Sequence, residues 1–226
     1  MKKAIIFDLD GTLFNNLNVY KDAHKEMFSK RGLEYKILPH DKGSKTLELM
    51  QTFSEYLKDQ TGENISAEEL LKEQDELVFD EYENKVEMTK GVREFLNFLN
   101  ENKIRKAVAT TARNKTIKIL FDKYDLWKEF EVIVCGEDIE KSKPDPEIYE
   151  KVFAKLNDNN NFEKLEKIDC LAIEDARSGI ESARNAGIEV VCIPNENAFN
   201  KDEDLSIANY ICESFEDEKL RGVVLK

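Results

Sequence analysis

The sequence lacks long apolar runs and is poor in positive charge. No run approaches the 18 or more apolar residues of a membrane-spanning helix, and the first residues lack the pattern of a signal peptide. The chain has 34 Lys and Arg against 47 Asp and Glu, a net charge of −13. This balance disfavours binding to nucleic acid or to an anionic membrane. An anionic small substrate stays possible, because a bound metal and a few local cations set the field inside a site.

Metal-type cysteine spacing is also lacking. Each of the four cysteines lies in or beside a short apolar run: Cys135, Cys170, Cys192 and Cys212. Buried, reduced thiols in a cytoplasmic protein are therefore expected. The length of 226 residues allows one domain with an insertion or two small domains, and nothing in the sequence requires more than a monomer.

Residues 16–86 show helical patterns and no strand. Apolar residues recur at helical spacing near positions 20–28 and 49–57, and Ser66 to Glu69 has the form of a capping box that opens a third helix. Three amphipathic helices without a strand predict a small bundle. After Gly91 the pattern changes, so the bundle is predicted to be an insertion.

Short apolar strands alternate with helical segments over the rest of the chain. Strands are predicted at residues 4–7, 106–111, 131–135, 170–173, 190–193 and 210–212, and helices at 92–99, 114–121, 146–156 and 178–186. Alternation of this kind predicts a parallel sheet covered by helices on both faces.

Polar side chains gather where these strands end, which is the edge at which open parallel sheets bind ligands. They are Asp8, Asp10, Thr110, Thr111, Glu174 and Asp175, and Lys143 lies in a loop between them. Carboxylate oxygens suit Mg²⁺, and Mg²⁺ together with a lysine would stabilise a phosphoryl group in transfer.

Four stretches carry a resemblance to a known family: DLDGTL at 8–13, AVATTA at 107–112, SKPDP at 142–146 and IEDARSGI at 173–180. In order and spacing they resemble the haloacid dehalogenase superfamily of phosphotransferases over nearly the whole chain. The resemblance implies an α/β fold, with a Rossmann-like parallel-sheet core at residues 1–15 and 88–226. It also implies an inserted all-helical cap domain at residues 16–87.

The resemblance implies roles for the reacting residues. Asp8 is the nucleophile that forms an aspartyl-phosphate, and Asp10 is the general acid and then the general base. Thr110 hydrogen-bonds a phosphate oxygen, with its neighbour Thr111 as the alternative. Lys143 neutralises Asp8 and the phosphoryl group.

Further roles concern the metal and the turn after the first strand. Mg²⁺ would be held by Asp8, by the backbone oxygen of Asp10 and by Asp175, with Glu174 binding it directly or through an intervening group. Thr12 would hold Asp10 in place.

The cap would exclude water and contact the substrate. Lys45, or Lys42, in DKGSKT at 41–46 is a candidate substrate contact, and a solvated lysine turn is the alternative. Thr111, Arg113 and Asn114 are further candidate substrate contacts; for Asn114 a plain helix start is the alternative.

The expected function is hydrolysis of a small phosphorylated metabolite. The nearest branch resembles β-phosphoglucomutases and sugar-phosphate phosphatases, so a hexose-phosphate mutase is the alternative. The mutases carry an aspartate and a histidine where this chain has Asn15, Asn16 and Tyr20, which favours the phosphatase. A non-catalytic phosphate- or partner-binding domain is disfavoured because no motif has lost its reactive residue. A receiver domain would be about half this length.

Overall fold

The computed structural model describes residues 1–36, 46–195 and 204–226. The chain divides into two compact units. Residues 1–17 and 86–226 form one, the α/β unit, and residues 18–85 form the other, the helical unit. No described helix combines the length and the apolar composition needed to cross a membrane.

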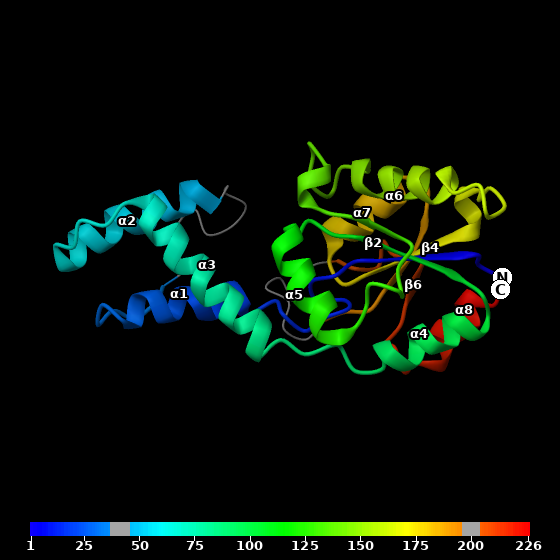
Figure 1. Cartoon of the computed structure of the whole chain (residues 1–226), viewed down its shortest axis with the longest axis horizontal. Helices are drawn as coiled ribbons and strands as arrows, with labels where there is room; N and C mark the ends of the chain where they lie inside the picture. Colours follow the sequence, from blue (N-terminus) through cyan, green and yellow to red (C-terminus); the bar gives the residue numbers. More distant parts are fainter. Residues whose placement is uncertain (37–45, 196–203) are drawn as a thin grey trace. The chain divides into compact units, whose positions relative to one another are not determined.

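The α/β unit is built on a six-stranded sheet in the order β3-β2-β1-β4-β5-β6 (Figure 1). The strands are β1 (Ala4–Phe7), β2 (Arg105–Ala109), β3 (Val132–Val134), β4 (Cys170–Glu174), β5 (Glu189–Cys192) and β6 (Tyr210–Ile211). All neighbours pair in parallel, and Ile6 of central β1 lies opposite Ala107 on one side and Ala172 on the other. The predicted parallel α/β fold is confirmed.

Side chains of β1 alternate between two apolar layers, as a period of two requires. Ala4 and Ile6 join a buried cluster with α6 (Glu147–Asp158) and α7 (Arg177–Asn185). Phe7 faces the other way, with its ring 6.1 Å from that of Phe95 in α4 (Val92–Glu101). Burying a side chain of this size contributes roughly 1.5–3 kcal/mol.

The remaining elements of the α/β unit complete its covering. They are α5 (Asn114–Tyr124), α8 (Glu218–Val224) and the short 3₁₀ helices Gly136–Asp138 and Lys167–Asp169. Figure 1 shows α4 and α8 on the opposite side of the sheet from α6 and α7. Helix α8 was not predicted from the sequence, because its seven residues are too few for a clear helical period.

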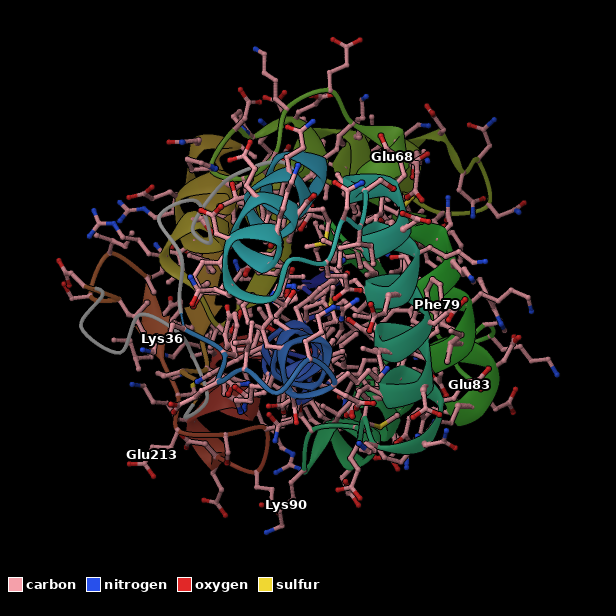
Figure 2. The ribbon with its side chains drawn as sticks, turned by 90° about the vertical axis from the view of Figure 1, so that its left-hand side faces the viewer. Lys36, Glu68, Phe79, Glu83, Lys90 and Glu213 are labelled. Atoms are coloured by element: carbon pink, nitrogen blue, oxygen red, sulfur yellow. The ribbon has the colours of Figure 1, made fainter. Side chains whose placement is uncertain are left out.

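The helical unit consists of α1 (Val19–Ser29), α2 (Thr46–Thr61) and α3 (Ala67–Asn84). Its core holds Met27, Phe28, Met50, Phe53, Leu57 and Leu70. The capping box of α3 is confirmed: Ser66 Oγ accepts from the backbone of Glu69, and the Glu69 carboxylate accepts from the backbone of Ser66. Figure 2 shows the exposed side chains of Glu68 and Glu83 projecting from α3.

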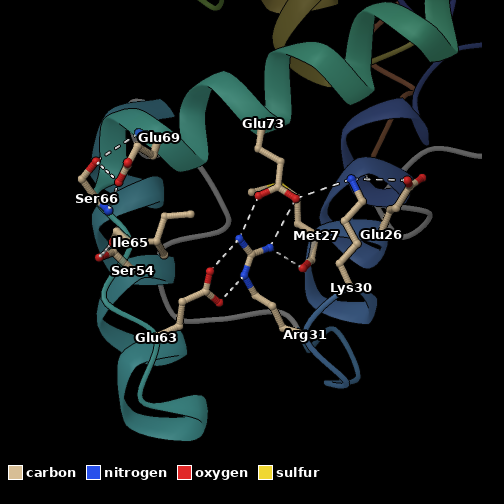
Figure 3. Close-up of polar contacts among 10 residues, drawn as sticks. All are labelled: Glu26, Met27, Lys30, Arg31, Ser54, Glu63, Ile65, Ser66, Glu69 and Glu73. Carbon is tan, nitrogen blue, oxygen red and sulfur yellow. Dashed lines mark hydrogen bonds and ion pairs between the residues drawn. The ribbon is translucent and has the colours of Figure 1, made fainter.

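Arg31, just after α1, connects three parts of the helical unit (Figure 3). Its guanidinium donates to Glu63 Oε2 at 2.8 Å, to Glu73 Oε2 at 2.9 Å and to the carbonyl of Met27 at 2.7 Å. Glu63 lies between α2 and α3 and Glu73 lies in α3. The network therefore joins the end of α1 to α3 and to the segment between α2 and α3.

Candidate active site

Three carboxylates meet where β1 and β4 end. Asp8 follows β1, Glu174 ends β4 and Asp175 follows it. The two strands pair side by side, and the backbone N–H of Asp8 donates to the Ile173 carbonyl at 3.0 Å. One oxygen from each of Asp8, Glu174 and Asp175 lies within 4.8 Å of the others, and all three residues are buried. We call these three residues the acidic cluster.

Lys143 supplies the positive charge that pairs with the acidic cluster. Its Nζ donates to Asp8 Oδ1 at 2.5 Å, to Glu174 Oε1 at 2.6 Å and to the Ala109 carbonyl at 3.0 Å. An ammonium has three N–H donors, so these contacts use all of them. The side chain is only 8% exposed, so each of these charge-assisted bonds forms away from water.

The pKa values of the acidic cluster are raised, which indicates that the positive charge of Lys143 does not offset the negative charge of three buried carboxylates. Burial raises the pKa of Glu174 to about 7; Lys143 opposes the rise and Asp8 adds to it. Burial, Asp8 and Glu174 raise the pKa of Asp175 to about 8, and burial also raises the pKa of Asp8 against the effect of Lys143. Buried carboxylate oxygens short of positive charge are a donor set that fits a hard divalent cation such as Mg²⁺.

Gly11 is required by the close approach of its backbone to this cluster. Its φ is +86°, and a Cβ at this position would lie 2.2 Å from Asp175 Oδ2. A side chain there would be strained and would push Asp175 aside. The glycine of the first motif therefore lets the chain turn sharply beside a carboxylate.

Asp10 is held by Asn16, a contact that the sequence analysis missed. Asn16 Nδ2 donates to Asp10 Oδ1, and Asn16 Oδ1 accepts from the backbone of Gly11 at 3.0 Å. The predicted role of Thr12 is wrong: its Oγ1 is buried and has no hydrogen-bond partner among the described residues. The tight turn from Leu9 to Phe14 brings Asn16 back to Asp10, and sequence spacing alone gives little sign of this.

The candidate site residues that follow β2 differ in their burial. Thr110 is buried, and its Oγ1 accepts from the backbone N–H of Ala112 at 3.0 Å, which leaves its own O–H free to donate. Thr111 is exposed, Arg113 precedes α5 and Asn114 begins it. Lys45 and its alternative Lys42 lie outside the described residues.

Two further polar residues of this region were not predicted. Glu137 accepts from the backbone N–H of Asn114 at 3.1 Å, which satisfies an N–H at the start of α5. Tyr149 is fully buried in α6, and its hydroxyl donates to Glu174 Oε1 at 2.5 Å. Burial and the negative charge of Glu174 raise the pKa of Tyr149 well above its usual value.

Comparison with known proteins identifies the family of this chain. A family model described as haloacid dehalogenase-like hydrolase matches residues 5–193. The chain belongs to this family. Among curated haloacid dehalogenase-like relatives, Protein CbbY of Rhodobacter capsulatus is 31% identical over 219 residues, covering 92% of this chain and 91% of that protein. The Phosphorylated carbohydrates phosphatase of Thermotoga maritima is 32% identical over 190 residues, covering 83% and 82%.

A solved structure shares the fold of this haloacid dehalogenase-like chain. CbbY from Rhodobacter sphaeroides, in complex with phosphate, aligns with a TM-score of 0.71 at 22% identity and covers 95% of each chain. The predicted family is confirmed. With named phosphatases among its relatives, the predicted enzyme class, a phosphoric monoester hydrolase, is also confirmed.

Proposed function

We propose that this protein is a Mg²⁺-dependent phosphatase that hydrolyses a small phosphorylated metabolite through an aspartyl-phosphate on Asp8. The observation that carries the proposal is the bond from Lys143 Nζ to Asp8 Oδ1 inside the buried acidic cluster. Sugar phosphates are the first substrate class to test, because a relative of 32% identity is a phosphatase of phosphorylated carbohydrates.

In the first half-reaction Asp8 attacks the phosphorus atom. Lys143 occupies Oδ1, so Oδ2 forms the new bond while the bond to the leaving oxygen breaks. Lys143 also lowers the charge repulsion between the carboxylate and the incoming phosphate. Asp10 gives its proton to the leaving oxygen. Asn16 donates to Oδ1 of Asp10, so this proton is carried on Oδ2.

In the second half-reaction Asp10, now ionised, takes a proton from water, and the water oxygen attacks the phosphorus of the aspartyl-phosphate. The bond to Asp8 Oδ2 breaks, so Asp8 is regenerated and inorganic phosphate leaves. Thr110 donates a hydrogen bond from its hydroxyl group to a phosphate oxygen in both steps. A covalent intermediate divides a slow hydrolysis into two faster reactions.

The acidic cluster fits Mg²⁺, as its burial and shortage of positive charge indicate. Asp8, Glu174 and Asp175 would hold the ion, together with the backbone oxygen of Asp10. When bound, the ion supplies positive charge that stabilises the phosphoryl group during transfer.

The helical unit would act as the cap that excludes water from the reaction. The predicted domain limits, residues 1–15 with 88–226 and residues 16–87, remain part of this proposal, as do the substrate contacts of Lys45, Thr111, Arg113 and Asn114. A hexose-phosphate mutase remains the second candidate. The absence of the mutase aspartate and histidine favours the phosphatase, in which water rather than a sugar hydroxyl accepts the phosphoryl group.

Phosphate release from a panel of sugar phosphates and other small phosphate monoesters, with Mg²⁺ and with a chelator, tests the proposal. We expect release only with Mg²⁺, and a loss of at least about 10³-fold in kcat for Asp8→Asn, because the amide is not a nucleophile. Conversion of a hexose 1-phosphate to its 6-phosphate without release of phosphate would instead establish the mutase. Full activity in chelator or in Asp8→Asn would contradict the mechanism.

A further inference from the structure

Tyr149 contacts two members of the site, although no motif includes it and the proposed steps do not use it. Its hydroxyl donates to Glu174 Oε1 at 2.5 Å, the same oxygen that accepts from Lys143 Nζ at 2.6 Å. Lys143 Nζ also lies 5.4 Å from the centroid of the Tyr149 ring. Tyr149 therefore packs beside the ammonium and binds the carboxylate that this ammonium also binds.

A second element packs against the same carboxylate. A Cβ added to Gly179 would lie 2.0 Å from Glu174 Oε2 and 2.4 Å from Oε1, so α7 leaves no room for a methyl group beside the carboxylate. Tyr149 in α6 binds Oε1, and Gly179 in α7 lets the backbone lie close to the whole carboxylate. A shift of the carboxylate would break the bond from Tyr149 or press an oxygen into α7.

The position of Glu174 in turn determines where Lys143 points. Lys143 Nζ binds Glu174 Oε1, Asp8 Oδ1 and the Ala109 carbonyl, so its three N–H bonds have fixed directions. If Glu174 Oε1 moved, the ammonium would lose one of its three acceptors. The N–H that donates to Asp8 would then no longer be held in direction by hydrogen bonds from the other two N–H groups.

We propose that Tyr149 is a positioning residue: by fixing Glu174 Oε1 it directs Lys143 Nζ at Asp8 Oδ1, and so orients Asp8 for attack on phosphorus. The kinetic part of this inference rests on the proposed phosphatase function. If Tyr149 only filled space in the core, its hydroxyl would be dispensable and phenylalanine would serve equally well.

Tyr149→Phe separates these roles, because it keeps the ring and removes the hydroxyl. We expect kcat to fall about tenfold to a hundredfold, the effect of one hydrogen bond to a charged group, with KM within about threefold. Tyr124→Phe is the matched control, since it removes a tyrosine hydroxyl that donates to the Val86 carbonyl at 2.9 Å. Its kcat should stay within about twofold of the native value.

A crystal structure of the Tyr149→Phe protein gives a second readout that needs no substrate. The expected result is that Lys143 Nζ no longer binds both Glu174 Oε1 and Asp8 Oδ1. Equal kcat values for Tyr149→Phe and Tyr124→Phe, or an unchanged Lys143 in the variant structure, would overturn the inference. If the native protein released no phosphate, the proposed function would fail, and the variant structure would still decide whether Tyr149 positions Lys143.

Gly179→Ala tests the same carboxylate from the other side. Its new Cβ would displace the Glu174 carboxylate, so we expect a fall in kcat like that of Tyr149→Phe, again with little change in KM. Gly222→Ala is the control, because a Cβ at that position would meet no described residue outside its own stretch of helix within 4 Å. A native kcat in the folded Gly179→Ala protein would contradict the proposal that the position of Glu174 orients Lys143.

Discussion

At the scale of the residue, Asn16 is the side chain that binds Asp10, the proposed general acid. Its amide bridges the backbone of Gly11 and the Asp10 carboxylate. The amide donates to Asp10 Oδ1, and in the proposed mechanism Oδ2 carries the proton to the leaving group. The proposed mechanism therefore depends on Asn16, six positions beyond the acid that it binds.

Asn16→Ala should lower kcat about tenfold or more, because it removes a hydrogen bond to the Asp10 carboxyl group. KM should change little, since Asn16 is not among the proposed substrate contacts. Steady-state kinetics measures both values. Asn15→Ala, at the exposed neighbouring position, is the control and should keep native kcat; an equal loss in the two variants would contradict the assigned role of Asn16.

At the scale of the element, the predictable part of the site is the part that lies at strand ends. Asp8 follows β1, Thr110 follows β2 and Asp175 follows β4, and a parallel sheet brings such ends together whatever the rest of the chain does. Apolar runs mark these strands in the sequence, so the sheet and the acidic cluster were both predictable.

The parts that were not predicted depend on packing between elements. Tyr149 lies on a buried helix face, where its sequence position indicates only a core aromatic residue. Thr12 was assigned to Asp10 by resemblance, whereas the turn of this chain delivers Asn16 instead. Contacts of this kind depend on side-chain directions across elements that are far apart in sequence, which spacing does not record.

The Arg31 network is the element-scale feature most open to a stability test. Arg31→Ala should lower the free energy of unfolding by about 1–3 kcal/mol, because the side chain is 11% exposed and its loss leaves Glu73 and the Met27 carbonyl without this donor. Urea unfolding followed by circular dichroism measures the change. Lys25→Ala breaks an exposed pair with Asp22 and should cost less than about 0.5 kcal/mol. Equal losses would show that the network contributes nothing.

At the scale of the whole molecule, the predicted burial of all four cysteines is confirmed. Burial raises the pKa of Cys135 to about 11, and hydrogen bonding to Asp138 adds to the effect. Burial also raises the pKa values of Cys170 and Cys192 to about 12. A higher pKa leaves less thiolate at every pH below it, and the thiolate is the reactive form.

The folded protein should therefore react slowly with a disulfide reagent such as DTNB at pH 8, because the thiols are buried and the raised pKa values disfavour the thiolate. In urea the pKa values return to about 8.5 and the four thiols should react quickly. Counting the thiolate released with time gives the result. Rapid reaction of one or more thiols in the native protein would contradict the described burial.

The central claim is that Asp8 carries the phosphoryl group, and trapping that intermediate tests it most directly. The native protein, mixed with Mg²⁺ and a substrate from the active panel, is quenched in acid within one turnover and reduced with borohydride, which converts an aspartyl-phosphate to homoserine. Peptide mass spectrometry then locates the modified residue. We predict homoserine at position 8, and none in the Asp8→Asn protein. Turnover with Asp8 unmodified, or with the phosphoryl group on another residue, would contradict the account.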